Sequence, residues 1–126
     1  MPSVVALRTV AADLSDYWSP RVVGEVDDSY VKVAKVKGSL TWHSHEHEDE
    51  LFLVLRGQLR IEMENESVVL REGDMFVVPK GTRHNPVAEE ECHVLLFERK
   101  STAHTGNVIT DRTRSIEEQL RGRSQG

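Results

Sequence analysis

The sequence contains a single cysteine, Cys92, so one chain cannot form an internal disulfide bond. The absence of internal disulfides is typical of proteins in a reducing compartment, and we expect the cytoplasm. Basic residues are also not in excess. The formal net charge is −5, which argues against general binding to the phosphate backbone of nucleic acids. We therefore predict a cytoplasmic protein without a nucleic-acid partner.

Long hydrophobic runs are absent as well. No segment approaches the roughly 18 apolar residues that a membrane-spanning helix requires, so no membrane partner is expected. Residues 1–14 also lack the basic start and long apolar core of a secretory signal. A chain of 126 residues is long enough for one buried core but not for two. We predict one domain over 1–126, with an N-terminal arm at about 1–20, a barrel at 21–100 and a tail at 101–126.

Hydrophobic periodicity predicts a short helix followed by many strands. Apolar residues recur at intervals of three and four between Leu7 and Leu14, which predicts an amphipathic helix over about 7–16. From Arg21 onward the period changes to two. Strands are expected at 22–26, 30–36, 51–55, 59–63, 67–70, 75–78 and 92–97, and one helical turn is expected at 116–120. Many short strands with little helix indicate an all-β protein, either an antiparallel sandwich or a jelly roll.

The segment from Gly38 to Gly57 concentrates side chains that can bind a metal. His43, His45 and His47 stand at alternate positions, and a run of acidic residues ends at Glu50. Successive side chains of a strand point to opposite faces, so His43 and His45 can project into the same cavity. Two imidazoles with a nearby carboxylate are suitable ligands for a divalent transition metal.

A second segment, from Gly73 to His84, supplies a third imidazole. A short apolar run is followed by Pro79-Lys80-Gly81, in which proline fixes one backbone angle and glycine permits a positive one. The chain should reverse sharply there and bring His84 back toward the face of the preceding strand. The predicted metal-ligand set is His43, His45, Glu50 and His84.

These two segments resemble the two signature motifs of the cupin superfamily. The first motif is matched by His43-x-His45, four residues, Glu50, six residues and Gly57. The second is matched by Gly73, five residues, Pro79-x-Gly81, two residues and His84. The resemblance to small single-domain, RmlC-like cupins extends over most of the chain.

Two positions depart from the family pattern. Gly38 stands one residue closer to His43 than the first motif requires, and Ala88 replaces the asparagine that ends the second motif. Neither position is a metal ligand in the family. The resemblance therefore implies a cupin double-stranded β-helix (jelly roll) with a short N-terminal helix and an intact metal site. It also implies a homodimer that forms through an exposed strand and the N-terminal segment.

Other residues near these motifs have simpler interpretations. His47 would leave only two residues before Glu50, so we expect it in a loop. Alternation places Glu50, rather than Asp49, on the face that carries Phe52 and Val54. Ordinary packing, solvated-turn or hydrogen-bonding roles are expected for Trp42, Lys80, Arg83, Cys92 and His93, a solvated acidic rim for Glu46, Glu48 and Asp49, and a place in the tail for His104.

Four protein ligands on an octahedral ion leave two positions for water, dioxygen or a chelating substrate. Imidazole and carboxylate ligands suit Mn, Fe, Ni or Zn, and the ligand set does not select among them. We expect a metal-dependent enzyme that acts on a small oxygenated organic substrate by isomerase, glyoxalase-like, dioxygenase or decarboxylase chemistry. Glu50 is the candidate catalytic base for an enolisation. The alternatives are a non-catalytic module that binds a sugar or small effector through the metal and, less favoured, a structural metal.

Overall fold

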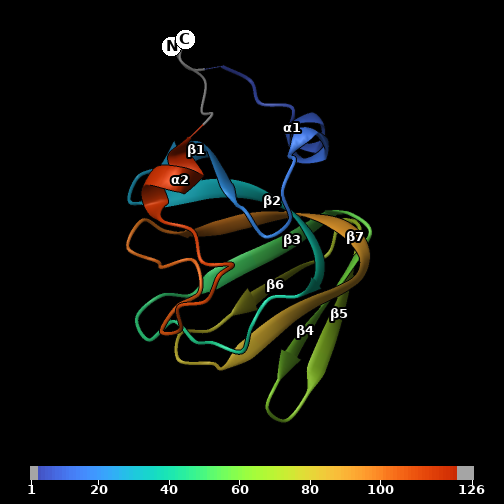
Figure 1. The fold of residues 1–126 in the computed structure, drawn as a ribbon, viewed down its shortest axis with the longest axis vertical. Coiled ribbons are helices and arrows are strands. Elements are labelled where there is room, and N and C mark those ends of the chain that lie inside the picture. The colour runs from blue at the N-terminus through green and yellow to red at the C-terminus, as the bar shows by residue number, and fades with distance from the viewer. Residues whose placement is uncertain (1–2, 122–126) are drawn as a thin grey trace.

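Seven antiparallel strands form a barrel in the computed structural model, which describes residues 3–121 (Figure 1). In chain order the elements are α1 (Leu7–Asp13), β1 (Arg21–Val26), β2 (Ser29–Ser39), β3 (Glu50–Arg56), β4 (Gln58–Met63), β5 (Ser67–Arg71), β6 (Met75–Val78), β7 (His84–Arg99) and α2 (Ile116–Leu120). The main path of the sheet is β1-β2-β7-β3-β6, and β4 joins β5 to β7. The expected all-β jelly roll with a short N-terminal helix is confirmed.

Strand β7 holds the barrel together because its two halves pair with different neighbours. Residues 93–98 lie between β2 and β3, whereas the first four residues pair with β4, and β2 also pairs with Val87 and Ala88. The sequence predicted only residues 92–97 of this strand, because Pro86 and the acidic run Glu89–Glu91 are typical of turns. In the structure the three glutamates are exposed, and the carbonyl of Pro86 accepts a hydrogen bond from the backbone N–H of Leu40 at 3.1 Å.

The barrel interior is filled by the alternate residues of each strand. On β3 the side chains of Glu50, Phe52 and Val54 are buried, while Leu51 and Leu53 are only partly buried. The predicted alternation of this strand is thus confirmed. The carboxylate of Glu50 consequently enters the same interior as the apolar core.

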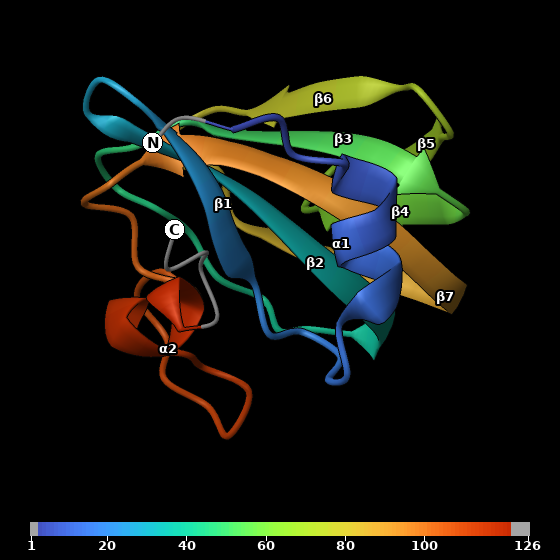
Figure 2. The same ribbon diagram turned by 90° about the horizontal axis from the view of Figure 1, so that it is seen from above.

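Helix α1 covers part of the outer face of the sheet (Figure 2). Ala11 of this helix and Leu14, the residue that follows it, pack with Val33 and Leu55 in a second apolar cluster. The helix ends at Asp13, three residues earlier than expected, because Leu14 takes an extended conformation. Helix α2 occupies the expected residues and begins with a capping box between Ser115 and Glu118.

Neither of these helices is long and apolar enough to cross a membrane. Dimerisation stays a prediction. Strand β6 lies at the edge of the main path and exposes Met75 and Val77.

Replacing Leu14 by Ala should lower the free energy of unfolding by about 2–3 kcal/mol, because the substitution leaves a cavity between α1 and the sheet. Urea denaturation measures this change. Arg8→Ala, an exposed substitution in the same helix, is the control and should have little effect. Equal stability of the two variants would show that α1 does not pack as described.

Candidate metal centre

A backbone pairing joins the two motifs. The backbone N–H of His43 donates to the carbonyl of His84 at 2.9 Å, and the N–H of His84 donates to the carbonyl of His43 at 2.8 Å. The expectation placed His43 on a regular strand, but residues 40–49 contain only this isolated bridge. The two imidazoles are therefore positioned by each other's backbone, with ring centroids 4.4 Å apart.

The predicted turn before His84 is present and also positions His45. The backbone N–H of Thr82 donates to the carbonyl of Pro79 at 3.1 Å, and Gly81 has a φ of 79°. Glycine suits this position because side chains disfavour a positive φ. The N–H of Gly81 then donates to the carbonyl of His45 at 2.7 Å. One tight turn thus fixes ligand candidates from both motifs.

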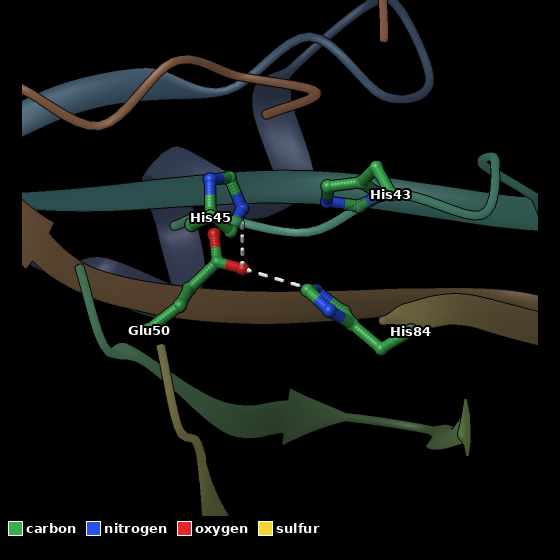
Figure 3. A group of neighbouring side chains, drawn as sticks. All are labelled: His43, His45, Glu50 and His84. Carbon is green, nitrogen blue, oxygen red and sulfur yellow. Dashed lines mark ion pairs between the residues drawn. The ribbon is translucent and has the colours of Figure 1, made fainter. Parts of the chain in front are cut away.

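The four predicted ligand side chains lie together inside the barrel (Figure 3). Their potential ligand atoms all lie within 4.8 Å of one another, and all four side chains are buried. Two nitrogens bound to one ion at about 2.1 Å can be at most about 4.2 Å apart. Only small movements would be needed for His43, His45, Glu50 and His84 to contact a single ion.

Backbone carbonyls orient two of the imidazoles. Nδ1 of His43 lies 2.9 Å from the carbonyl oxygen of Thr41, and Nδ1 of His84 lies 2.9 Å from that of Thr82. A carbonyl oxygen only accepts, so each Nδ1 must carry the proton. Each neutral ring then presents the lone pair of Nε2 to the cluster. This arrangement is typical of metal-binding histidines.

Several atoms of the cluster have no hydrogen-bond partner. Among the described residues, these include Nε2 of His45, Oε1 of Glu50 and Nε2 of His84, all fully buried. Oε1 of Glu50 lies 3.3 Å from the first nitrogen and 3.5 Å from the second, within ion-pair distance but without hydrogen-bond geometry. Buried polar atoms without partners are costly. A divalent cation would satisfy all three, so the residues fit a metal ion.

The electrostatics of the cluster suit metal binding. Burial, reinforced by the electrostatic effect of the nearby His84, lowers the pKa of His43 to about 4, so its ring is neutral at pH 7. Burial alone would raise the pKa of Glu50, but the contacts from His45 and His84 outweigh it and hold that pKa well below its usual value. The cluster therefore offers the neutral imidazole of His43 and the ionised carboxylate of Glu50, the protonation states that metal binding requires.

A second buried carboxylate, Glu98, lies beside the cluster, and sequence reasoning missed it. Glu98 is opposite Glu50 in the β3–β7 pairing. Burial and the charge of Glu50 raise the pKa of Glu98 well above its usual value. The ammonium of Lys32 lies 3.4 Å from Glu98 and 2.5 Å from Oε1 of Gln119 in α2. No sequence motif links Lys32 to Glu98, because only strand register brings the two residues together.

The rival candidates lie outside the cluster. His47 is exposed, as expected for a loop residue. The side chain of Asp49 accepts a hydrogen bond from the backbone N–H of Lys80, and that of Glu48 accepts one from Ser101. His93 lies 2.9 Å from Glu91. The remaining candidates have packing contacts: Arg83 stacks over the ring of Trp42, and Cys92 is buried, with its pKa raised to about 12 by burial.

The C-terminal segment 100–115 crosses the rim of the barrel beside the cluster. Asn107 is joined to Ser44 by two hydrogen bonds: its side chain accepts from the Ser44 N–H, and its N–H donates to the Ser44 carbonyl. A side chain at Gly106 could not fit, because its Cβ would lie 2.1 Å from the carbonyl oxygen of Ser44 and 3.2 Å from the ring of His43. Glycine thus permits the close approach.

The comparison with protein families decides the classification. Residues 29–98 match the family model of the cupin domain, and these are more than half of the chain. The chain is a cupin. Its barrel is therefore a cupin double-stranded β-helix, as the resemblance of the two motifs implied.

Three relatives of this cupin are informative. The uncharacterized protein YdbB of Bacillus subtilis is 35% identical over 85 residues, covering 67% of this cupin and 75% of YdbB. The 3-hydroxyanthranilate 3,4-dioxygenase 2 of Aspergillus fumigatus is 32% identical over 87 residues, covering 64% of this cupin but only 45% of the enzyme. The crystal structure of a cupin-2 domain containing protein from Shewanella frigidimarina has a TM-score of 0.75 at 37% identity, covering 77% of this cupin and 95% of that chain.

His104 should make the stability of the metal-free cupin depend on pH. Burial, followed by the charge of Lys32, lowers the pKa of His104 from 6.5 to about 4. The unfolded chain therefore binds more protons between these pH values, so stability is complete above pH 6.5 and falls as the pH decreases toward 4. His104→Asn should reduce this loss by about 1–3 kcal/mol, measured by urea denaturation in the presence of a chelator.

The control for this measurement is His47→Asn, which removes an exposed imidazole and should leave the pH dependence unchanged. Identical pH dependence in the wild type and His104→Asn would contradict the burial of this ring.

Proposed function

We propose that this cupin binds one divalent transition metal through His43, His45, Glu50 and His84 and uses it to transform a small oxygenated organic molecule. The observation that carries this proposal is the convergence of buried ligand atoms without hydrogen-bond partners. A purely apolar or fully hydrogen-bonded interior would satisfy the fold without such atoms. Four ligands also leave coordination positions open for substrate, unlike the closed shell of most structural sites.

Dioxygenase chemistry is the reaction class that we propose. The dioxygenase of Aspergillus fumigatus is similar to this cupin over 87 residues, 64% of the chain, which supports this class over the isomerase and decarboxylase alternatives. An iron(II) ion held by the four residues would supply the activation of dioxygen. Such a reaction needs no dedicated protein base, so Glu50 can act as a ligand throughout.

The protein itself would orient the imidazole ligands and exclude water from the inner side of the site. The carbonyls of Thr41 and Thr82 hold two imidazoles in one tautomer. The apolar interior around Phe52 and Val78 keeps the inner side of the site dry. The buried Lys32 lies 3.4 Å from Glu98, whose raised pKa leaves Glu50 as the ionised carboxylate of the pair. These features would keep the ligands in place without the need for rearrangement during turnover.

Replacing His45 by Ala should abolish stoichiometric metal binding, because it removes one of four ligands. If the wild type is studied at about a thousandfold the dissociation constant of the metal, losing that binding should destabilise the protein by about 4 kcal/mol. Elemental analysis and thermal unfolding measure the two effects. His47→Ala is the matched control and should keep its metal. Full metal content in His45→Ala would remove this residue from the site.

The iron(II)-loaded protein should consume dioxygen when supplied with 3-hydroxyanthranilate or related aminophenols and catechols. An oxygen electrode measures the uptake, and the zinc-loaded protein should show none because zinc has no redox chemistry. Glu50→Ala and His84→Ala should both lose the activity. Turnover of a substrate by the iron-loaded protein without dioxygen would instead favour isomerase or decarboxylase chemistry.

A further inference from the structure

The C-terminal segment and α2 line a cavity that includes none of the four clustered side chains in its lining. Its volume is about 410 Å³, and residues between Lys100 and Gln119 line it. This volume lies within the usual range for small-molecule sites, about 300–1,000 Å³. No aspartate or glutamate contributes to the lining, although the chain as a whole has a net charge of −5. The cavity therefore differs in charge from the rest of the surface.

Arg114 is the cation of this cavity that is available to a ligand. The other basic lining residue, Lys100, already lies 2.9 Å from a carboxylate oxygen of Glu25. The guanidinium of Arg114 donates to the backbone carbonyls of Asp111 and Thr113, and within residues 3–121 it forms no ion pair. Carbonyls do not neutralise its charge. A planar guanidinium is well suited to bind a carboxylate.

Thr102 and His104 add two further polar groups to the lining. The hydroxyl oxygen of Thr102 is fully buried and has no hydrogen-bond partner within the described part of the chain. Nδ1 of His104 accepts a hydrogen bond from the backbone N–H of Arg114 at 2.9 Å. The proton of a neutral imidazole must then be on Nε2, which makes that atom a donor. Donors and a cation together favour an anionic, oxygen-bearing ligand.

The remaining wall of the cavity is apolar and lies next to the metal centre. Val108, Ile109 and Ile116 contribute to the lining, and the side chain of Ile109 is 89% exposed. Gly106, another lining residue, directly adjoins the ring of His43. Gln119 connects the cavity to Glu98 through the buried ammonium of Lys32. A ligand with an apolar body would therefore lie beside the ligand cluster.

We propose that this cavity binds the substrate as a small organic acid, with its carboxylate on Arg114 and hydrogen bonds from His104 and Thr102. The apolar body would pack against Val108 and Ile116. The identity of this ligand as the substrate rests on the proposed metal chemistry, whereas the preference for a carboxylate rests on Arg114 alone. The two can therefore be tested separately.

Titrations with benzoate and with benzamide, its uncharged analogue, test the site by ligand-observed NMR. The wild type should bind benzoate about tenfold more tightly than benzamide, because only benzoate can pair with Arg114. Arg114→Gln should lose this preference. Arg112→Gln, an exposed substitution in the same segment, should keep it. Thr102→Val preserves the shape of the side chain and should weaken benzoate binding several-fold.

The same titrations after chelation separate this site from the metal centre. The preference for benzoate should persist without metal if Arg114 holds the carboxylate. A preference that disappears with the metal but survives in Arg114→Gln would place the carboxylate on the ion and overturn the assignment. Absence of any preference in the wild type would overturn it as well. Metal content measured on the same samples reports independently on the four-ligand site.

Discussion

The pair of backbone hydrogen bonds between His43 and His84 is the constraint on which the centre depends. These residues are far apart in the sequence, yet each donates to the carbonyl of the other. These two backbone hydrogen bonds hold the centroids of the two imidazole rings 4.4 Å apart, although the rings themselves are not bonded to each other. The Nε2 lone pairs stay available because each Nδ1–H donates a hydrogen bond to a neighbouring carbonyl. The side chains of the cluster are therefore organised by the protein alone.

Much of this arrangement could be predicted from the sequence. The two-residue period identified most strands, and the spacing of the two motifs identified the four clustered side chains. The first half of β7 was missed because proline and three adjacent glutamates favour a turn, and pairing with β4 and β2 overrides that local preference. Glu98 was missed because its environment is created by strand register. The role of these clustered residues as metal ligands is our proposal.

Two carboxylates beside each other in a protein interior would normally repel. Glu50 of β3 and Glu98 of β7 are directly opposite each other in the strand pairing. Their pKa values are shifted in opposite directions, downward for Glu50 and upward for Glu98. Contacts with His45 and His84 account for the lowered value, and burial together with the charge of Glu50 accounts for the raised one. The barrel thus separates an ionised carboxylate from one that favours its protonated form.

The crossing at Gly106 has a consequence for engineering this barrel with segments from related proteins. The C-terminal segment can lie against the rim only because the crossing residue has no side chain. A chimera that transplants another cupin's terminal segment would need glycine at this point and a side-chain acceptor for the N–H of Ser44, as Asn107 provides. The terminal segment and the rim of the barrel would therefore have to be exchanged together in such a chimera.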